Sequence, residues 1–511
     1  MPKTRIFASF LLMGSLAGCA GLGMKSVPWP TSTEVHDVQA VDFLRSAPAV
    51  DAGLGGNLFM KEMFDDGRLV GLSVSGGGAR AAAFTLGVLT ELQAIGQGGS
   101  NMLDRIDFIS SNSGGSWGVA AYLADRAASR DAGYKLLDRM QLPKGNSLID
   151  RFDRMSDGTV KCWSSAMREH LFGERTYGDI YSSANPVPLP RVFINAALLP
   201  SHSPFVFSDA FLRHYRVERF GACGDHWLTE EGSPPVRNVA DLQFGYAAAA
   251  SGTVSPFYHA FASTGLCAGD SPAREASFCH SILKGKPRSY LRIADGGYYD
   301  NIGYKTAYEV MLGLNGESPE ARRAMIFVNS NTATDLQMIA PAKRSSSFLI
   351  TTAGNGLMAV QDSTFERLYK PMFGSVRVKE PVLLDFYSTA RFRPDQAHLL
   401  SDLRELAFYA ANNVACFNGE RFVEPKRRRS PLEPPPAQES VAKLAGKGGD
   451  CLSENFYRAG TLAKTTYKID STLFTILWQL GRLSVRMNCR GIVGGVEGQS
   501  GGPGCRRYDA G

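Results

Sequence analysis

Residues 69–80 read LVGLSVSGGGAR, and this stretch decides the fold class. The apolar run Leu69–Ser75 predicts a buried strand, and three glycines follow it directly. Beyond the glycines, apolar residues recur at helical spacing, namely Phe84, Leu86, Leu89, Leu92 and Ile95. A strand, a glycine turn and a helix in this order are typical of an α/β domain.

The same alternation of strands and helices continues to about residue 335. Further strands are predicted at Ile106–Ser110, Val192–Ala196, Ser289–Ala294 and Met325–Asn329. Helices are predicted at Trp117–Ala128 and Lys305–Leu314. This pattern predicts a mostly parallel central sheet with helices on both faces, in a domain over residues 61–335.

The chain after residue 335 is organised differently. Residues 336–423 are predicted to complete the core and to include a helix at Gln396–Cys416. Residues 424–450 form a proline-rich, basic linker, which is either a solvated segment or a contact for anionic lipid headgroups. Residues 451–511 are predicted to be a helical extension, with a helix at Asn455–Met487 and a mobile glycine-rich tail over the last twenty residues.

The N-terminus has the layout of a secretory signal peptide. Lys3 and Arg5 precede the apolar run Ile6–Leu16, which is too short to span a bilayer as a permanent helix. The following Leu16–Cys19 resembles the lipobox of bacterial lipoproteins, in which the cysteine is acylated. An ordinary signal peptide with a chance cysteine is the alternative.

The lipobox resemblance implies a lipid anchor at Cys19. Residues 1–18 are then the signal peptide and residues 19–60 a membrane tether. Ala20 follows the cysteine, where an aspartate would favour the inner membrane. The protein is therefore expected on the periplasmic side of the outer membrane.

Composition narrows the classes of function. The 511 residues carry a formal net charge of only +6, and no RNA- or DNA-binding signature accompanies it, so nucleic acid is not an expected partner. Eight of the nine cysteines remain if Cys19 carries lipid, which allows up to four disulfides in an oxidising compartment, with open connectivity. No CxxC pair and no metal-ligand spacing is present, so neither a metal nor a cofactor is expected.

The glycine-rich loop Ser75–Arg80 is the first of three segments that carry chemistry. Its glycines allow backbone N–H groups at a helix N-terminus to face a ligand, which is either a phosphate or the oxyanion of a tetrahedral intermediate. The loop lacks the Gly-Lys-Ser/Thr of a Walker A motif and a clean GxGxxG, which disfavours a nucleotide. A plain glycine turn is the remaining alternative.

The second segment is Ser111-Asn112-Ser113-Gly114-Gly115, between a predicted strand and a predicted helix. It has the layout of a nucleophile elbow, in which small residues must flank the central serine at two positions on each side. Ser113 meets this requirement, although Ser111 stands where glycine is usual. A solvent-exposed loop is the alternative.

The third segment is Asp295-Gly296-Gly297, also at a strand end. The two glycines allow the carboxylate to approach another backbone closely, although Asp-Gly is also common in plain turns. A triad would need a histidine after the acid, but only His398 follows Asp295, on a predicted helix. A histidine base is therefore not favoured.

Together and in this order, the three segments resemble those of the patatin-like phospholipases. That family has a glycine-rich oxyanion loop, a GxSxG elbow and a later Asp-Gly-Gly/Ala, and Ala247–Ser251 with Pro256 and Phe257 looks like the segment preceding that Asp-Gly. The resemblance covers residues 68–332 and implies a three-layer α/β sandwich.

The resemblance also implies a mechanism and a substrate class. Ser113 would be the nucleophile and Asp295 its base, in a Ser–Asp dyad that hydrolyses phospholipids or other acyl esters through an acyl-enzyme. The backbone amides of Gly76, Gly77 and Gly78 would form the oxyanion hole, with Arg80 as a supporting basic residue.

Three other functions remain open at this point. The first is a catalytically inactive, lipid-anchored periplasmic binding or assembly protein on the same fold. The second is a thioesterase or peptidase, and the third is a nucleotide-binding protein. The sequence does not indicate the oligomeric state.

Overall fold

The computed structural model describes the central α/β domain and a C-terminal helical segment. The described residues are 66–97, 100–129, 131, 133–141, 146–156, 163–182, 188–199, 203–215, 217–222, 239–253, 260–264, 289–314, 320–330, 370–379, 381–390, 469, 471–498, 505 and 508. Several predicted features lie outside them: the signal peptide, Cys19, the tether, Pro256, Phe257, the helix at 396–416 with His398, the linker at 424–450, and Cys162, Cys223, Cys267, Cys279, Cys416 and Cys451.

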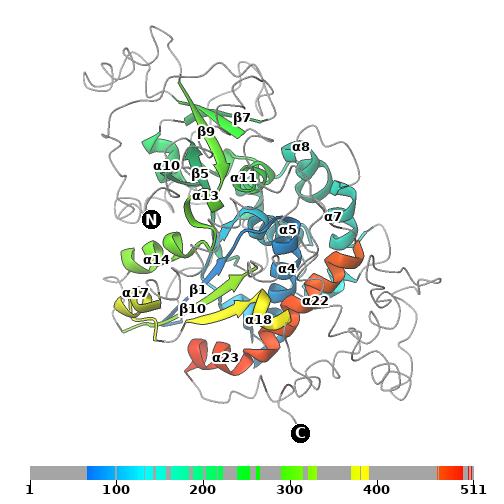
Figure 1. The fold of residues 1–511 in the computed structure, drawn as a ribbon, viewed down its shortest axis with the longest axis vertical. Helices are drawn as coiled ribbons and strands as arrows, with labels where there is room; N and C mark the ends of the chain where they lie inside the picture. Colours follow the sequence, from blue (N-terminus) through cyan, green and yellow to red (C-terminus); the bar gives the residue numbers. More distant parts are fainter. Residues whose placement is uncertain are drawn as a thin grey trace, which may run out of the picture.

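A nine-stranded sheet forms the centre of the molecule (Figure 1). Five neighbouring strands run parallel, in the order β11 (Val382–Asp385), β10 (Arg322–Asn329), β1 (Arg68–Val74), β4 (Phe108–Asn112) and β5 (Arg191–Leu199). The sheet continues antiparallel through β9 (Ser289–Asp295), β8 (Ala260–Thr264) and β7 (Val217–Ala222), and β6 (Ser203–Val206) also pairs with β5. The predicted α/β fold with a mostly parallel sheet is confirmed.

Helices cover both faces of this sheet. In Figure 1, α4 (Gly78–Ala94), α5 (Ser113–Ser129) and α22 (Ser471–Met487) lie on one side of β1 and β10, whereas α14 (Tyr304–Gly313) and α17 (Lys370–Ser375) lie on the other. The remaining α-helices are α6 (Leu136–Met140), α7 (Leu148–Ser156), α8 (Trp163–Met167), α9 (Tyr177–Ile180), α10 (Asp209–His214), α11 (Phe244–Ser251), α13 (Gly297–Asp300), α18 (Phe386–Ala390) and α23 (Cys489–Glu497). Shorter elements are a π-helix at Arg168–Phe172, 3-10 turns at Leu103–Arg105 and Val239–Asp241, and a hairpin of β2 (Gly96–Gln97) and β3 (Ser100–Asn101).

Strand β1 is buried along its length because parallel strands flank it and helices cover both faces. Only Arg68, its first residue, is partly exposed. A Cβ on Gly71 would collide with the Phe108 ring, so glycine provides the space that this aromatic ring occupies. The apolar run in the sequence therefore reflects burial on both faces.

Two predicted boundaries at the elbow differ from the structure. The second strand is displaced by two residues, because the Asp107 carboxylate accepts a hydrogen bond from the Val70 N–H at 2.6 Å before β4 begins. Helix α5 begins at Ser113 and not at Trp117, so the serine opens the helix. Among the residues described, no helix is both long enough and apolar enough to cross a membrane.

The C-terminal helix α22 packs closely against α4. A Cβ on Gly87 would collide with the Trp478 carbonyl oxygen, and one on Gly481 would collide with the Phe84 carbonyl oxygen. The Trp478 indole N–H also donates to Thr90 Oγ1 at 3.1 Å. Two opposed glycines thus bring the helix backbones into contact.

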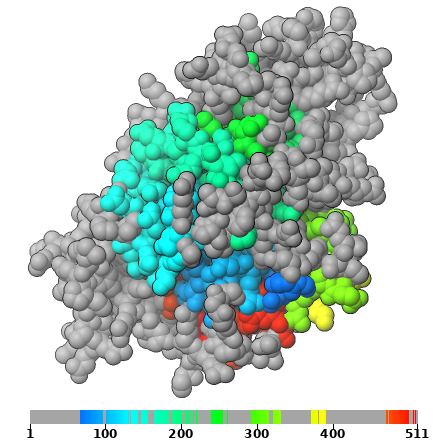
Figure 2. Space-filling view, turned by 180° about the vertical axis from the view of Figure 1, so that it is seen from behind, coloured from blue at the N-terminus to red at the C-terminus, as the bar shows by residue number. Residues whose placement is uncertain are grey.

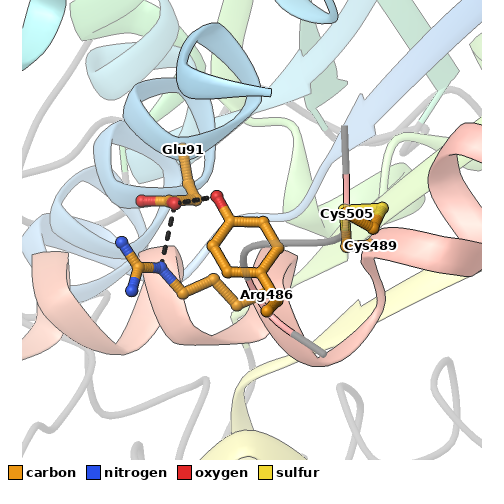
Figure 3. The surroundings of a disulfide bond; sticks show 5 residues. Glu91, Arg486, Cys489 and Cys505 are labelled. Carbon is orange, nitrogen blue, oxygen red and sulfur yellow. Dashed lines mark hydrogen bonds and ion pairs between the residues drawn. A yellow bond between two sulfur atoms is a disulfide. The ribbon is translucent and has the colours of Figure 1, made fainter. Parts of the chain in front are cut away.

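A buried charge cluster and a disulfide fix this C-terminal segment (Figure 3). Glu91 on α4 is fully buried and accepts hydrogen bonds from Nε of Arg482 and of Arg486, each at 2.9 Å, and from the Tyr508 hydroxyl. Burial alone would raise the pKa of Glu91, but the two guanidinium groups and the hydroxyl lower it to about 2. The carboxylate is therefore charged and paired at neutral pH.

Part of the predicted glycine-rich tail lies within the residues that the structure describes. Helix α23 continues to Glu497, and Cys505 forms a disulfide with Cys489. Tyr508, three residues after Cys505, packs in the core. Figure 2 shows C-terminal residues (red) bordering the first described residues (blue) on one face of the molecule.

Candidate active site

Ser113 lies on a strained turn between β4 and α5. Its φ of 46° is in the left-handed region that non-glycine residues seldom adopt, and Arg377 is the only other such residue in the described ranges. The Ser113 N–H donates to Ser251 Oγ at 2.8 Å. Ser113 is therefore both the residue after β4 and the first residue of α5.

Two glycines after Ser113 allow α5 to start against the glycine-rich loop. A Cβ on Gly114 would collide with the Gly78 carbonyl, and one on Gly115 would collide with the Ser75 carbonyl. Only glycine fits at these positions, so the Ser-Gly-Gly sequence follows from the close approach of two backbones.

Asp295 is the last residue of β9, and its carboxylate meets the serine. Ser113 Oγ donates to Asp295 Oδ2 at 2.6 Å, and the Gly297 N–H donates to Oδ1 at 2.8 Å. A Cβ on Gly296 would lie 2.7 Å from the Asn195 carbonyl oxygen, so glycine is needed here for the approach of β9 to β5. The fold thus brings together two residues that lie 182 positions apart.

The environment of Asp295 favours a base that titrates near neutrality. The side chain is buried, with 8% of its surface exposed. Burial raises the pKa of Asp295 to about 6, although the hydrogen bonds from Ser113 and Gly297 lower it in part. A carboxylate with a pKa near the working pH is a more effective general base than one near 4.

The glycine-rich loop lies beside the serine. A Cβ on Gly76 would lie 3.0 Å from Ser113 Cβ, which places the two backbones in contact. Gly77 and Gly78 have positive φ values of 138° and 62°, and α4 begins at Gly78. The first N–H groups of a helix have no acceptor inside it and carry partial positive charge, so they suit an anion.

The three predicted oxyanion glycines are not equivalent. The Gly76 N–H donates to the Asn301 carbonyl oxygen at 2.8 Å and is therefore already engaged. Gly77 and Gly78 are the two whose amides lie at the helix start. An oxyanion hole in this geometry depends on Gly77 and Gly78.

Arg80 is buried beneath the loop, with 1% of its surface exposed. A Cβ on Gly77 would lie 3.0 Å from its Nη2 atom, and its guanidinium carbon lies 5.9 Å from the centre of the Phe386 ring. Arg80 therefore connects the glycine-rich loop to α18 and provides positive charge near it.

The supporting hydrogen bonds of several polar residues near Ser113 were not predicted from the sequence. The Asn195 side-chain amide donates to the Ser111 carbonyl at 3.0 Å, and Thr306 Oγ1 donates to Asn195 Oδ1 at 2.8 Å. The Asn112 side chain donates to the Asp300 carbonyl. Their signal was a polar side chain within or beside an apolar strand, because buried polar groups need hydrogen-bond partners.

The structure also accommodates Ser111 in place of the usual glycine. Its side chain is fully buried, and its Oγ accepts a hydrogen bond from Ser116 Oγ at 3.1 Å. The extra hydroxyl thus has a partner. In the described ranges, no group of three or more His, Cys, Asp or Glu residues could hold a metal ion.

The sequence was also compared with protein families and with known proteins. A family model described as patatin-like phospholipase matches residues 72–308. Among curated protein sequences, none matches the chain.

Solved structures of human GIVD cytosolic phospholipase A2 are also similar to the chain. The structure of that protein alone is 14% identical, with a TM-score of 0.40, over 90% of this chain and 66% of that one. Its complex with methyl gamma-linolenyl fluorophosphonate is 15% identical, with a TM-score of 0.35, over 92% and 65%. The complex that also contains terbium chloride is 16% identical, with a TM-score of 0.38, over 90% and 64%, so this chain spans about two thirds of the length of these structures.

The family match begins in β1, ends in α14, and includes the glycine-rich loop, the serine elbow and the Asp-Gly-Gly segment. These are the three segments that meet at the buried Ser113–Asp295 hydrogen bond. Residues 72–308 of this chain thus match the patatin-like phospholipase family, and the fold brings the three segments of that match together.

Proposed function

We propose that this protein is a serine acyl hydrolase, a phospholipase A or lipid esterase, with Ser113 and Asp295 as its catalytic dyad. One observation supports this proposal above the others. The Ser113 hydroxyl donates to the buried Asp295 carboxylate at 2.6 Å from a backbone strained at a φ of 46°. A structural serine needs neither the strain nor a carboxylate partner.

The first chemical step is acyl transfer to the serine. Asp295 takes the hydroxyl proton while Ser113 Oγ forms a bond to the ester carbonyl carbon. The tetrahedral intermediate collapses as the ester C–O bond breaks, and the protonated Asp295 returns its proton to the leaving alcohol. Water then repeats the sequence, with Asp295 as its base, and releases the fatty acid and the free serine.

The oxyanion of each intermediate would bind to backbone amides at the start of α4. Gly77 and Gly78 are the donors in this proposal, because the Gly76 amide is already bonded to Asn301. Each donor of this kind contributes roughly 2.7–4 kcal/mol to transition-state stabilisation. Arg80 supports the loop from beneath.

The proposed substrate is a phospholipid or another acyl ester in a membrane, which the family match supports. A lipid anchor on Cys19 would hold the enzyme at that surface, on the periplasmic side of the outer membrane. Mass spectrometry of the mature N-terminus and the fractionation of Cys19→Ser test this anchor. A Cys19→Ser protein that remains in the membrane fraction, or an unacylated Cys19, would refute it.

Covalent labelling with a fluorophosphonate tests the catalytic proposal without a known substrate. The probe is attacked by an activated serine, which forms a bond to phosphorus as fluoride leaves. Wild type should label at Ser113, Ser113→Ala should not label, and Asp295→Asn should label far more slowly. Ser73→Ala is the control, because Ser73 is a buried serine whose hydroxyl donates to the Ile302 carbonyl.

Two outcomes would contradict the proposal. A folded, oxidised wild-type protein that does not label would favour the inactive binding protein. Labelling that persists in Ser113→Ala would place the nucleophile elsewhere. Hydrolysis of phospholipid vesicles, followed by mass spectrometry of released fatty acids, would then distinguish a phospholipase from a thioesterase assayed on acyl-thioesters.

A further inference from the structure

We infer that Ser251 is a positioning residue for the nucleophile, an inference that rests on the proposed function. Ser251 ends α11 and is fully buried. Its hydroxyl oxygen accepts the Ser113 N–H at 2.8 Å and so holds the backbone of the strained residue. Ser251 acts on the backbone of the nucleophile and takes no proton from its hydroxyl.

Ser251 connects three parts of the site. Its hydroxyl donates to the Asn195 carbonyl oxygen on β5 at 2.5 Å, which orients the oxygen lone pairs toward Ser113. Its own carbonyl accepts the Gly296 N–H at 3.0 Å, next to Asp295. One residue therefore fixes the position of the nucleophile's turn relative to the turn of its base.

A second serine supports this arrangement. Ser116 Oγ lies 3.0 Å from Ser251 Oγ and 3.1 Å from Ser111 Oγ, and all three side chains are fully buried. Ser111 occupies the position where a GxSxG elbow has glycine. The added hydroxyl thus completes a cluster, Ser111–Ser116–Ser251, behind the nucleophile.

The strain at Ser113 explains why an external acceptor is needed. A non-glycine residue at positive φ relaxes unless its surroundings hold it there. Without the Ser251 hydroxyl, the Ser113 N–H becomes a buried donor without an acceptor. This unsatisfied donor favours a change in the backbone dihedral angles of the turn. A displacement of about 1 Å between reacting groups can reduce a rate on the order of 100-fold.

The test measures the rate and the final extent of fluorophosphonate labelling separately. Ser251→Ala is expected to label to the same extent as wild type, with a limiting rate constant lower by about 10- to 100-fold and an unchanged concentration dependence. Ser251→Cys keeps the size and offers a weak sulfur acceptor, so its rate should lie between those of wild type and Ser251→Ala. Ser73→Ala loses a comparable buried hydroxyl and should label at the wild-type rate.

The outcomes separate a positioning role from a structural one. Partial unfolding would lower the extent of labelling and leave the rate constant of the folded fraction unchanged, which would overturn the inference. A Ser251→Ala rate within twofold of wild type, or an equal loss in Ser73→Ala, would also overturn it. In these cases wild type still labels and the proposed function stands, whereas an unlabelled wild type overturns both.

Discussion

The pH dependence of Ser113 acylation follows directly from the burial of Asp295. Burial raises the pKa of Asp295 to about 6, and the carboxylate must be deprotonated to accept the serine proton. The rate should therefore rise with pH through about 6 and reach a plateau above it. With that value, about one carboxyl in eleven is ionised at pH 5 and about ten in eleven at pH 7, which predicts a roughly tenfold difference in rate.

The assay is the labelling rate constant between pH 4.5 and 8, with circular dichroism to confirm folding at each pH. Asp300 needs a control, because burial also raises the pKa of its carboxyl to about 6. That carboxyl accepts the Lys305 N–H at 2.7 Å, and Asp300→Asn keeps an oxygen acceptor there. The midpoint should persist in Asp300→Asn. A flat profile, or a midpoint near the value of about 4 for an exposed aspartate, would refute the assignment of Asp295 as a buried base.

Three further predictions concern the C-terminal segment, and urea unfolding measures each one. Glu91→Gln leaves two buried guanidinium groups without a charge partner and should lower the free energy of unfolding by about 3–5 kcal/mol. A loss below about 1 kcal/mol would contradict the paired cluster. Gly481→Ala forces a methyl group against a backbone carbonyl of α4 and should cost about 1–3 kcal/mol, whereas Gly374→Ala, with no atom within 4 Å of the new Cβ, should cost nothing. Cys505→Ser removes the bridge to Cys489, which spans 16 residues, and should cost about 3 kcal/mol, a loss that reduction of wild type should reproduce.

The sequence predicted the three chemical segments because each one has a strong local signal. Buried strands appear as continuous apolar runs, and glycines mark the places where a Cβ has no room. Ser113 and Asp295 both stand at the ends of predicted strands and are followed by glycines, so their positions could be predicted although 182 residues separate them. The direction of β9 could not be predicted, because the residues of a short strand do not distinguish a parallel from an antiparallel neighbour.

What the sequence could not predict depends on long-range contacts. The engagement of the Gly76 amide by Asn301 depends on a loop more than 200 residues away. The pattern of α22 predicted a helix with a buried face but not its partner, because periodicity gives a face and not its neighbour. The ion pair between Glu91 and Arg486 could not be predicted, because only the fold brings these two residues together.

The contact between α4 and α22 has a consequence for the timing of synthesis. Its hydrogen bonds join residues 388 to 395 positions apart, so the ribosome makes α4 long before its partner exists. At roughly 5–20 residues per second, the interval is about 20–80 s. During this time the face of α4 that carries Gly87 and Glu91 lacks its cover. Helix α4 begins at the proposed oxyanion loop. Until α22 has been synthesised, its apolar surface is therefore exposed to chaperones or to aggregation.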